Sequence, residues 1–186
     1  GANNSNTTRL ETTTYPSGHV VTHNYGGAGE MDDILSRPAA VKDGATSYVD
    51  YQYLGLRTPV IAESPTPGAS LTYVSQGSEA DLYGDPYNGL DWYGRVVDQR
   101  WIKSGNDLDR VQYGYTENSL KEWHKNLVAN GLSEKEDDFY QYDNLSQIKV
   151  RERGVLTPGN VISNIAETED WTYDPSGNWT AYSHEE

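Results

Sequence analysis

The sequence has no cysteine, one phenylalanine and one methionine. The absence of cysteine excludes disulfide bonds, thiolate metal ligands and thiol catalysis. Leucine, isoleucine, valine and phenylalanine together supply 33 of the 186 residues. Such a small aliphatic content with a large net charge is typical of disordered chains. Any folded core must therefore come from another residue type.

Positive charge is also scarce: 14 Lys and Arg stand against 28 Asp and Glu, for a net charge of -14. Nucleic-acid binding depends on clustered positive charge, so the composition argues against a nucleic-acid partner. The sequence contains no apolar run of membrane-spanning length and no basic amphipathic face, which argues against membrane insertion. The sequence begins at Gly1 without a methionine or a hydrophobic signal segment, so we expect a processed form or a piece of a longer chain.

Aromatic residues are plentiful, with 15 Tyr and 5 Trp. Each such ring buries on the order of 150–250 Å². We therefore expect a folded chain whose interior is aromatic and partly hydrated. Abundant Asn, Thr, Ser, Gly and Tyr with few Lys are typical of bacterial secreted proteins, so we expect a secreted or cell-surface location.

The aromatic residues follow a recurring pattern of aromatic, any residue, aromatic, and then a turn. Aromatics at i and i+2 lie on one face of a β-strand, and Asp, Asn, Pro, Ser and Gly favour tight turns. The pattern occurs at Tyr51–Gly55, Tyr113–Asn118, Tyr140–Asn144 and Trp171–Gly177, with single-aromatic versions at Tyr15–Gly18 and Tyr87–Gly89. The turn tyrosines 15, 53, 87, 115, 142 and 173 are spaced by 38, 34, 28, 27 and 31 residues. This spacing predicts a repeat protein built from β-hairpins.

The pattern predicts an all-β fold in which antiparallel hairpins form an open-ended array. Residues 1–8 are polar and read as a flexible or partner-dependent arm, and residues 9–186 as a single β domain. Strands are expected at 9–15, 19–25, 46–53, 56–62, 69–75, 95–103, 108–115, 137–142, 146–153 and 169–173, with a short irregular or helical turn at 30–37. Pro59, Pro65, Pro67 and Pro86 cannot donate to a ladder and mark edges, bulges or loops.

The segment 118–131 supports two interpretations. Leu120, Trp123, Leu127 and Val128 have helical spacing, with Asn118 or Ser119 as a cap and Gly131 as a stop. Its place in the repeat instead requires the second strand of a hairpin. We expect mostly strand near 119–127.

The sequence offers weak candidates for metal binding or catalysis. His19 and His23 lie four residues apart in a β-branched stretch, where about 13 Å separates them and prevents a shared ion. Acidic clusters at 134–138 and 167–170 resemble the carboxylate pairs of glycosidases, but we interpret them as a solvated face. We expect no catalytic residue, no metal site and no cofactor. Oxygen-rich sequences at 106–109 and 137–138 leave a loosely bound calcium as an alternative.

Exposed aromatic rings are the best binding candidates. Trp92, Tyr93, Trp123 and Trp179 are the candidates for a platform on which a polysaccharide would stack. We favour the competing interpretation, in which these rings form cross-strand ladders that stabilise a thin β-array.

Three segments resemble the tyrosine–aspartate (YD) repeat of RHS-type proteins, and in particular those of planctomycetes. These are Tyr87-Asn88-Gly89-Leu90-Asp91-Trp92-Tyr93-Gly94-Arg95-Val96-Val97-Asp98-Gln99-Arg100-Trp101, Tyr142-Asp143-Asn144-Leu145-Ser146-Gln147-Ile148 and Tyr173-Asp174-Pro175-Ser176-Gly177-Asn178-Trp179. The resemblance implies an array of β-hairpins that, in large members, winds into a shell enclosing a toxin or forms a cell-surface scaffold. This chain is too short to close such a shell.

These observations predict a non-enzymatic extracellular protein with a structural or adhesive role. Its open sheet edges lead us to expect pairing with copies of itself, head to tail in a fibre, or with neighbouring repeats of a longer parent. Two alternatives remain open at this point: a carbohydrate-binding module that uses its exposed Trp and Tyr, and a fragment of a toxin-enclosing RHS shell.

Overall fold

The computed structural model describes residues 9–77, 79 and 84–186, and the expected arm at 1–8 lies outside them. Within the described residues, thirteen strands form one sheet in which neighbouring strands are antiparallel and the spatial order follows the sequence order. The strands are β1 Thr12–Thr14, β2 Val20–Asn24, β3 Ala40–Asp43, β4 Thr46–Leu54, β5 Thr58–Ser64, β6 Ala69–Thr72, β7 Asp98–Lys103, β8 Asn106–Tyr115, β9 Lys121–Asn126, β10 Asp137–Tyr142, β11 Ile148–Thr157, β12 Val161–Tyr173 and β13 Trp179–Glu185. The all-β, open-ended fold predicted from the sequence is confirmed.

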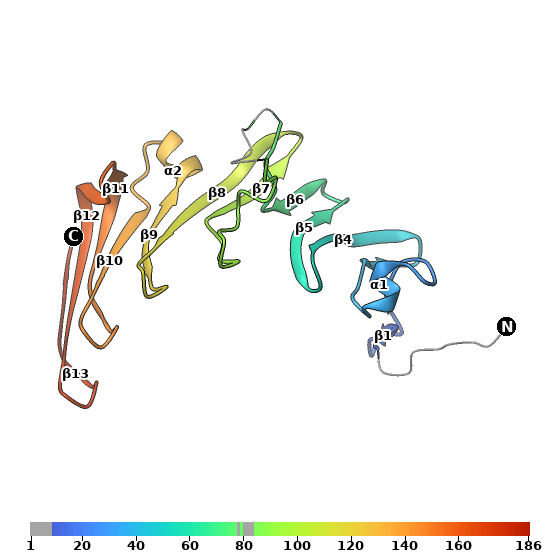
Figure 1. Ribbon diagram of the computed structural model, residues 1–186, viewed down its shortest axis with the longest axis horizontal. Coiled ribbons are helices and arrows are strands. Elements are labelled where there is room, and N and C mark those ends of the chain that lie inside the picture. The colour runs from blue at the N-terminus through green and yellow to red at the C-terminus, as the bar shows by residue number, and fades with distance from the viewer. Residues whose placement is uncertain (1–8, 78, 80–83) are drawn as a thin grey trace.

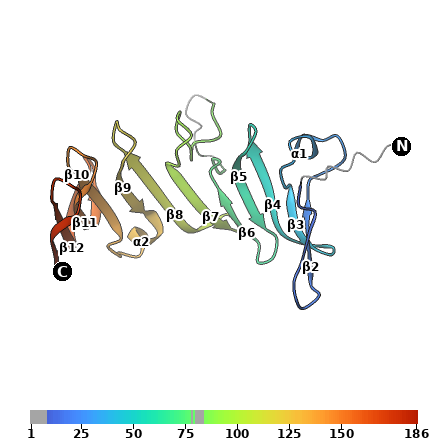
Figure 2. The same ribbon diagram turned by 90° about the horizontal axis from the view of Figure 1, so that it is seen from below.

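The sheet is a single layer that bends into an arch, with β1 and β13 at its two ends (Figure 1). Because each strand pairs with the next, the turns alternate between two long margins of the sheet (Figure 2). We call one margin the tyrosine rim; it carries the connections 25–39, 55–57, 73–97, 116–120, 143–147 and 174–178. The other margin is the opposite rim.

Most expected strands are present, but with different limits. The structure adds two strands, β3 and β13, that the sequence analysis missed, and extends β12 back to Val161. The short helical turn expected at 30–37 is α1, Met31–Ile34. Pro59 faces Tyr53 next to a register shift in the β4–β5 ladder, as expected for a proline near a bulge.

The ambiguous segment 118–131 contains both structures. Strand β9 covers Lys121–Asn126, and the short helix α2 follows at Leu127–Gly131. The strand expected near 119–127 is thus confirmed over Lys121–Asn126, whereas the helical alternative with a cap at Asn118 or Ser119 does not hold, because these residues form a turn in which Ser119 has a φ of 63°. Asn126 is the actual cap: its side-chain oxygen accepts hydrogen bonds from the backbone N–H groups of Val128 and Ala129.

The core is small. Among the described residues, the buried apolar side chains are Val21, Tyr25, Ala40, Val60, Ala69, Ala129, Leu156 and Ile162. The buried polar residues are Thr72, Asp137 and Asp138. Within the part of the chain that the structure describes, no second layer covers the sheet, so its stability depends on contacts between side chains of neighbouring strands.

Five tyrosines close the sheet at the tyrosine rim, and we call them hook tyrosines. Each hydroxyl donates a hydrogen bond of 2.6–2.7 Å to a backbone carbonyl 15–25 residues earlier in the chain. The pairs are Tyr25 with Leu10, Tyr53 with Pro38, Tyr115 with Val96, Tyr142 with Lys121 and Tyr173 with Ile148. For the last four, the register of the ladder to the next strand shifts immediately before the tyrosine.

The aspartate of the repeat has a separate task, which is to cap the turn. One carboxylate oxygen of Asp143 accepts from the backbone N–H groups of Leu145 and Gln147 at 2.8 and 2.9 Å. Asp91 and Asp174 make the same pair of bonds to the residues two and four positions later. The fourth turn residue has a positive φ, which Gly94 adopts at 74° and Ser146 at 64°.

Two tyrosines of the predicted series do not belong to it. Tyr15 lies at the opposite rim, and its backbone N–H and carbonyl bond to His19 and Gly18 as those of the capping aspartates do in their turns. In the unit at Asp91 the residue before the aspartate is Leu90, so Tyr87 is displaced from the hook position. Tyr25, which the sequence analysis left out, is the first hook.

The hooks predict a stability effect. In the Tyr115→Phe variant the carbonyl of Val96 loses its donor, so we expect the free energy of unfolding to fall by about 1–2 kcal/mol. Urea denaturation measures this change. Tyr93→Phe is the matched control, because Tyr93 is 84% exposed, and it should change the stability by less than about 0.5 kcal/mol. Equal effects of the two substitutions would contradict the role of the hook.

Candidate interaction surfaces

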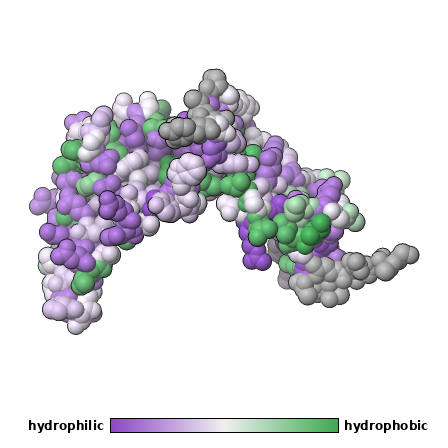
Figure 3. Space-filling view, in the orientation of Figure 1, coloured by the Kyte–Doolittle hydropathy of each residue, from purple (hydrophilic) through white to green (hydrophobic). Residues whose placement is uncertain are grey.

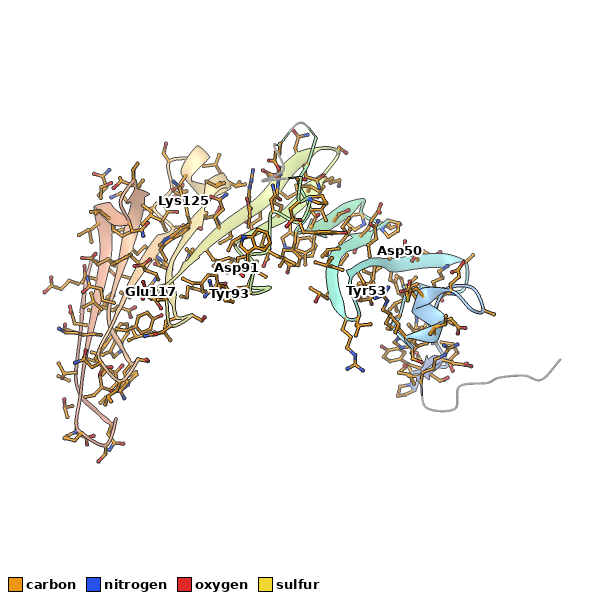
Figure 4. All side chains as sticks on the ribbon, viewed as in Figure 1. Asp50, Tyr53, Asp91, Tyr93, Glu117 and Lys125 are labelled. Carbon is orange, nitrogen blue, oxygen red and sulfur yellow. The ribbon has the colours of Figure 1, made fainter. Side chains whose placement is uncertain are left out.

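The four aromatic residues expected to form one platform lie in three separate places. Trp92 and Tyr93 lie at the tip of the turn between Asp91 and Arg95, where they are 88% and 84% exposed. Figure 4 shows Asp91 and Tyr93 in this turn, with Glu117 in the neighbouring turn of the same rim. The guanidinium of Arg95 lies 5.0 Å from the centre of the Tyr93 ring. This pair is a local aromatic tip and does not extend to the other two residues.

Trp123 is a packing residue of the sheet. Its indole lies against Gly114 on the adjacent strand β8, so that a Cβ at position 114 would come within 2.1 Å of the indole nitrogen. Glycine at this position lets the large ring lie flat on the backbone of its neighbour. This contact supports the interpretation that Trp123 packs across neighbouring strands and stabilises the sheet.

Trp179 belongs to an aromatic cluster at the C-terminal end of the sheet. The ring centres of Trp171, Trp179 and Tyr182 are 5.7–6.5 Å apart, and the planes of Trp179 and Tyr182 differ by 21°. Trp179 and Tyr182 are 67% and 50% exposed. The cluster covers the outermost hairpin, β12–β13, with aromatic surface. Polysaccharide binding by any of these rings stays a prediction.

The acidic segment 134–138 is not uniformly solvated, which corrects part of the sequence analysis. Asp137 and Asp138, at the start of β10, are 0% and 2% exposed. Asp137 accepts hydrogen bonds from the backbone of Asn126 and Leu156 and from the side chain of Asn130. These four bonds join β9, α2 and β11 through a single carboxylate.

Asp138 is the centre of a charged ladder that crosses the last five strands. Its carboxylate accepts from Arg151 and Arg153 on β11 at 3.1 and 3.0 Å, and His124 on β9 lies 3.3 Å from it. Arg151 also contacts Glu169 on β12. The ladder ends at the outer strand, where His184 lies 3.1 Å from Glu167 and Tyr182 donates to Glu169 at 2.8 Å. The acidic cluster at 167–170 therefore partly neutralises the arginines.

A second charged group joins β7 and β8. Arg110 bonds to Asp98 at 2.6 Å, and Arg100 bonds to Asp107 at 2.8 Å. Glu79 contacts both arginines, at 2.7 and 3.2 Å. This carboxylate ties the connection before β7 to the sheet. Figure 3 shows one side of the molecule, where polar residues cover much of the surface and apolar residues gather over α1 and near the middle of the arch.

Burial and the contacts within the two charged groups shift several pKa values. Burial, with a further contribution from Asp138, raises the pKa of Tyr140 to about 12. The hydrogen bond from Arg151 is the largest influence on Glu169 and lowers the pKa of its carboxyl. Desolvation alone would raise the pKa of Glu79, but its bonds to the Gln76 backbone and to Arg100 and Arg110 outweigh burial and lower it. These shifts stabilise charged carboxylates and neutral tyrosines in the folded state.

The residues considered for metal binding have other partners. His19 lies 3.9 Å from Asp43, and His23 lies 3.4 Å from the hydroxyl of Thr13. Asp107 pairs with Arg100, and Asp109 accepts from Asn126. Within the described ranges, no group of three or more histidine or acidic residues has the arrangement of a metal site. The loosely bound calcium is not tested by this geometry and stays a prediction.

A groove of about 430 Å³ lies at the tyrosine rim between the β8–β9 and β10–β11 turns. Strands β9 and β10 pair only through Asp138 with His124 and Phe139 with Trp123, so they separate towards this rim. The separation leaves the groove, which is lined by Thr116, Asn118, Leu120, Glu122, Phe139, Tyr140, Gln141, Tyr142, Asp143, Asn144 and Ser146. The lining contains two carboxylates and no lysine or arginine. This groove could not be predicted from the sequence, because its presence depends on how strands β9 and β10 diverge.

The two ends of the sheet differ. Strand β1 has three residues, all threonine, and Pro16 follows closely. Strand β13 has seven residues, each of them exposed, and contains neither lysine nor proline. Natural edge strands are usually short or carry lysine, proline or bulges, which prevent pairing with another chain. Strand β13 has one of these features, a register shift near its first residue, and is otherwise an open pairing edge.

The charged ladder predicts a large effect of one substitution. Asp138→Asn removes the charge that faces Arg151 and Arg153, so we expect the free energy of unfolding to fall by about 3 kcal/mol. Urea denaturation at neutral pH measures the loss. The control is Asp170→Asn, because Asp170 is exposed on the same sheet. A loss below about 1 kcal/mol for Asp138→Asn would show that the ladder adds little to stability.

A pH dependence follows from Tyr140. Its folded-state pKa of about 12 lies above the unfolded value of about 10. The associated stability is therefore complete below pH ~10 and is lost as the pH rises towards ~12. Urea midpoints measured from pH 8 to 11.5 should fall over the upper part of this range, and less steeply for Tyr140→Phe. The same alkaline slope in both proteins would assign the loss to other groups.

Membrane spanning by a helix has no support in the described part of the chain, where neither helix is long and apolar enough to cross a bilayer. No family model and no curated protein matches the sequence. Solved structures do match the fold, at a TM-score of about 0.6 in each of three cases. The fold is therefore what this chain shares with proteins of known structure.

The matching structures are Tc toxin assemblies. The Photorhabdus luminescens Tc holotoxin pore with a TccC3 mutation has a TM-score of 0.61 and 14% identity over 93% of this chain. The TcdB2–TccC3–TEV and TcdB2–TccC3–Cdc42 crystal structures both have TM-scores of 0.62, with 16% and 14% identity over 95% and 94% of this chain. This chain spans 8% of the length of each matched chain. At these identities the likeness shows the fold alone, and that fold is RHS-like.

Proposed function

We propose that this chain is a non-enzymatic, extracellular structural segment, a portion of the curved wall of an RHS-type shell, that continues by strand pairing at β13. The observation that carries this proposal is the open, arched, single-layer sheet. A single layer with no covering layer is suited to be a wall, because its stabilising contacts run along the sheet. The fold match to a small part of the Tc toxin chains supports the same reading.

The distribution of carboxylates supports a structural role over a catalytic one. Glycosidases need a raised pKa on one of two carboxyl groups that face a bound substrate. In this sheet Asp138 and Glu169 contact arginines, and the pKa of Glu169 is lowered. Ion pairs of this kind hold strands together and favour the ionised form, which is the opposite of what a general acid requires.

A second candidate is self-assembly of copies into a fibre, which the unequal sheet ends favour. Strand β13 offers a row of unpaired backbone groups, and the short β1 lies at the far end of the arch. Pairing of β13 with the N-terminal edge of another copy would be a head-to-tail contact, which extends into a filament when it does not close. In both the shell and the fibre, β13 pairs with a further strand. In the shell the next repeat of a longer parent supplies that strand, and in the fibre another copy of this chain supplies it.

The pairing edge is tested by a charge placed on β13. We expect wild-type protein to associate with increasing concentration in sedimentation velocity, and Ala181→Lys to remain monomeric, since lysine on an edge strand opposes pairing. Thr66→Lys is the matched control, because it adds the same charge in the exposed β5–β6 turn of the opposite rim, away from both ends of the sheet. Negative-stain images of the associated fraction separate fibres from curved closed particles. A wild-type monomer at all concentrations, or equal association of both variants, would contradict the proposal.

A further inference from the structure

Three hook tyrosines carry an arginine on their ring. The guanidinium carbons of Arg9, Arg37 and Arg95 lie 4.3, 4.5 and 4.5 Å from the ring centres of Tyr25, Tyr53 and Tyr115. Each arginine is the residue directly before the carbonyl that accepts the hook, and we call this place the ring-stacking position. Each arginine also pairs with a carboxylate, which is Asp33, Asp32 and Asp91 respectively. The repeat thus builds the same guanidinium site three times.

At Tyr142 the arginine is missing. The acceptor of this hook is Lys121, so Leu120 occupies the ring-stacking position. A leucine is shorter than an arginine and carries no charge. Leu120 and Tyr142 both line the groove of about 430 Å³. The groove therefore lies where the other three units place a guanidinium.

The carboxylates around this groove have bonding capacity left. One oxygen of Asp143 caps the turn, and its second oxygen, Oδ2, accepts no hydrogen bond from the described residues. In the equivalent turn the second oxygen of Asp91 accepts from Arg95 at 2.6 Å. Glu122 lines the groove as well and contacts only the amide of Asn160, at 3.3 Å. The groove combines two tyrosines, two carboxylates and no basic side chain.

The last hook shows how the position can be filled in another way. For Tyr173 the ring-stacking position is Gln147, whose amide nitrogen lies 2.9 Å from the place a Cβ on Gly177 would take. The side chain of Gln147 thus reaches the neighbouring turn. In the unit at Tyr142, the short side chain of Leu120 leaves the groove open beside Glu122 and Asp143, which have bonding capacity left.

We propose that this groove binds the guanidinium group of an arginine supplied by a partner chain. A guanidinium is planar, stacks on aromatic rings and donates to two carboxylates in a fixed geometry. An ammonium reproduces the charge without the planar stacking. An uncharged group of the same shape can still donate hydrogen bonds to Glu122 and Asp143 but lacks the charge attraction that strengthens them. The predicted order of affinity is therefore arginine, then lysine, then citrulline.

A second copy of this chain has a suitable arginine. Arg57 lies exposed in the β4–β5 turn of the tyrosine rim and makes no ion pair within the described residues, whereas the other seven arginines pair with carboxylates. The alternative source is an arginine on a different protein. Both sources present the same chemical group, and the variants below distinguish them.

The groove is tested directly with short peptides and amide NMR spectra of the full chain. Gly-Arg-Gly should shift the resonances of residues 118–122 and 140–146 in a saturable manner, and at least tenfold more tightly than Gly-citrulline-Gly. Leu120→Arg places a guanidinium in cis at the ring-stacking position and should weaken Gly-Arg-Gly binding at least tenfold. Leu120→Met is the control, because it keeps the site apolar and should bind as the wild type does.

Two further variants test the groove if Leu120→Arg folds poorly. Glu122→Gln removes one carboxylate while leaving the fold intact, and should weaken Gly-Arg-Gly binding at least threefold. Arg57→Gln identifies the source: reduced self-association means that a second copy supplies the arginine, and unchanged self-association assigns it to another protein. Equal binding of the arginine and citrulline peptides, or unchanged binding to both Leu120→Arg and Glu122→Gln, would overturn the proposal. Neither result bears on pairing at β13.

Discussion

The structure depends on contacts between neighbouring strands, because a single-layer sheet offers little interior in which to bury apolar side chains. The described part of the chain buries eight apolar residues, among them three alanines. A sheet of this kind gains its stability from ladders across strands and from hydrogen bonds that close each unit. The ladder at Asp138 and the hooks at the tyrosine rim supply these two contributions. The small aliphatic content of the sequence is thus a consequence of the architecture.

Much of the fold could be predicted from the sequence, because the signal that defines it is local. The aromatic pairs and the turn residues that follow them locate one rim of the sheet, and the strands on both sides of those turns follow. Strand β13 was missed because it follows the last turn and no later repeat marks its end. Strand β3 was missed because Ala40–Asp43 is too short to show an alternating pattern.

The candidate sites were harder to predict, for a physical reason. The sequence shows that Trp92 and Trp179 are aromatic residues close to turns, but exposure depends on what packs against each ring. Trp123 lies on Gly114, a neighbour that only the strand register reveals. The burial of Asp137 likewise depends on α2 and Leu156, which come from two other parts of the chain. Residue type indicated which side chains could bind a ligand or form an ion pair, and the strand register decided which of them are exposed and which are packed in the sheet.

The direction of the hooks has a consequence for how the chain folds. Every hook tyrosine bonds to a carbonyl that precedes it, so each unit closes on a segment that has already left the ribosome. The register shift beside the hook then starts a new ladder, and an error in one hairpin is not passed to the next. Folding can therefore proceed from the N-terminus one unit at a time, with short loops to close at each step. This order of contacts allows the array to grow during synthesis as a chain of completed units, before its last strand is made.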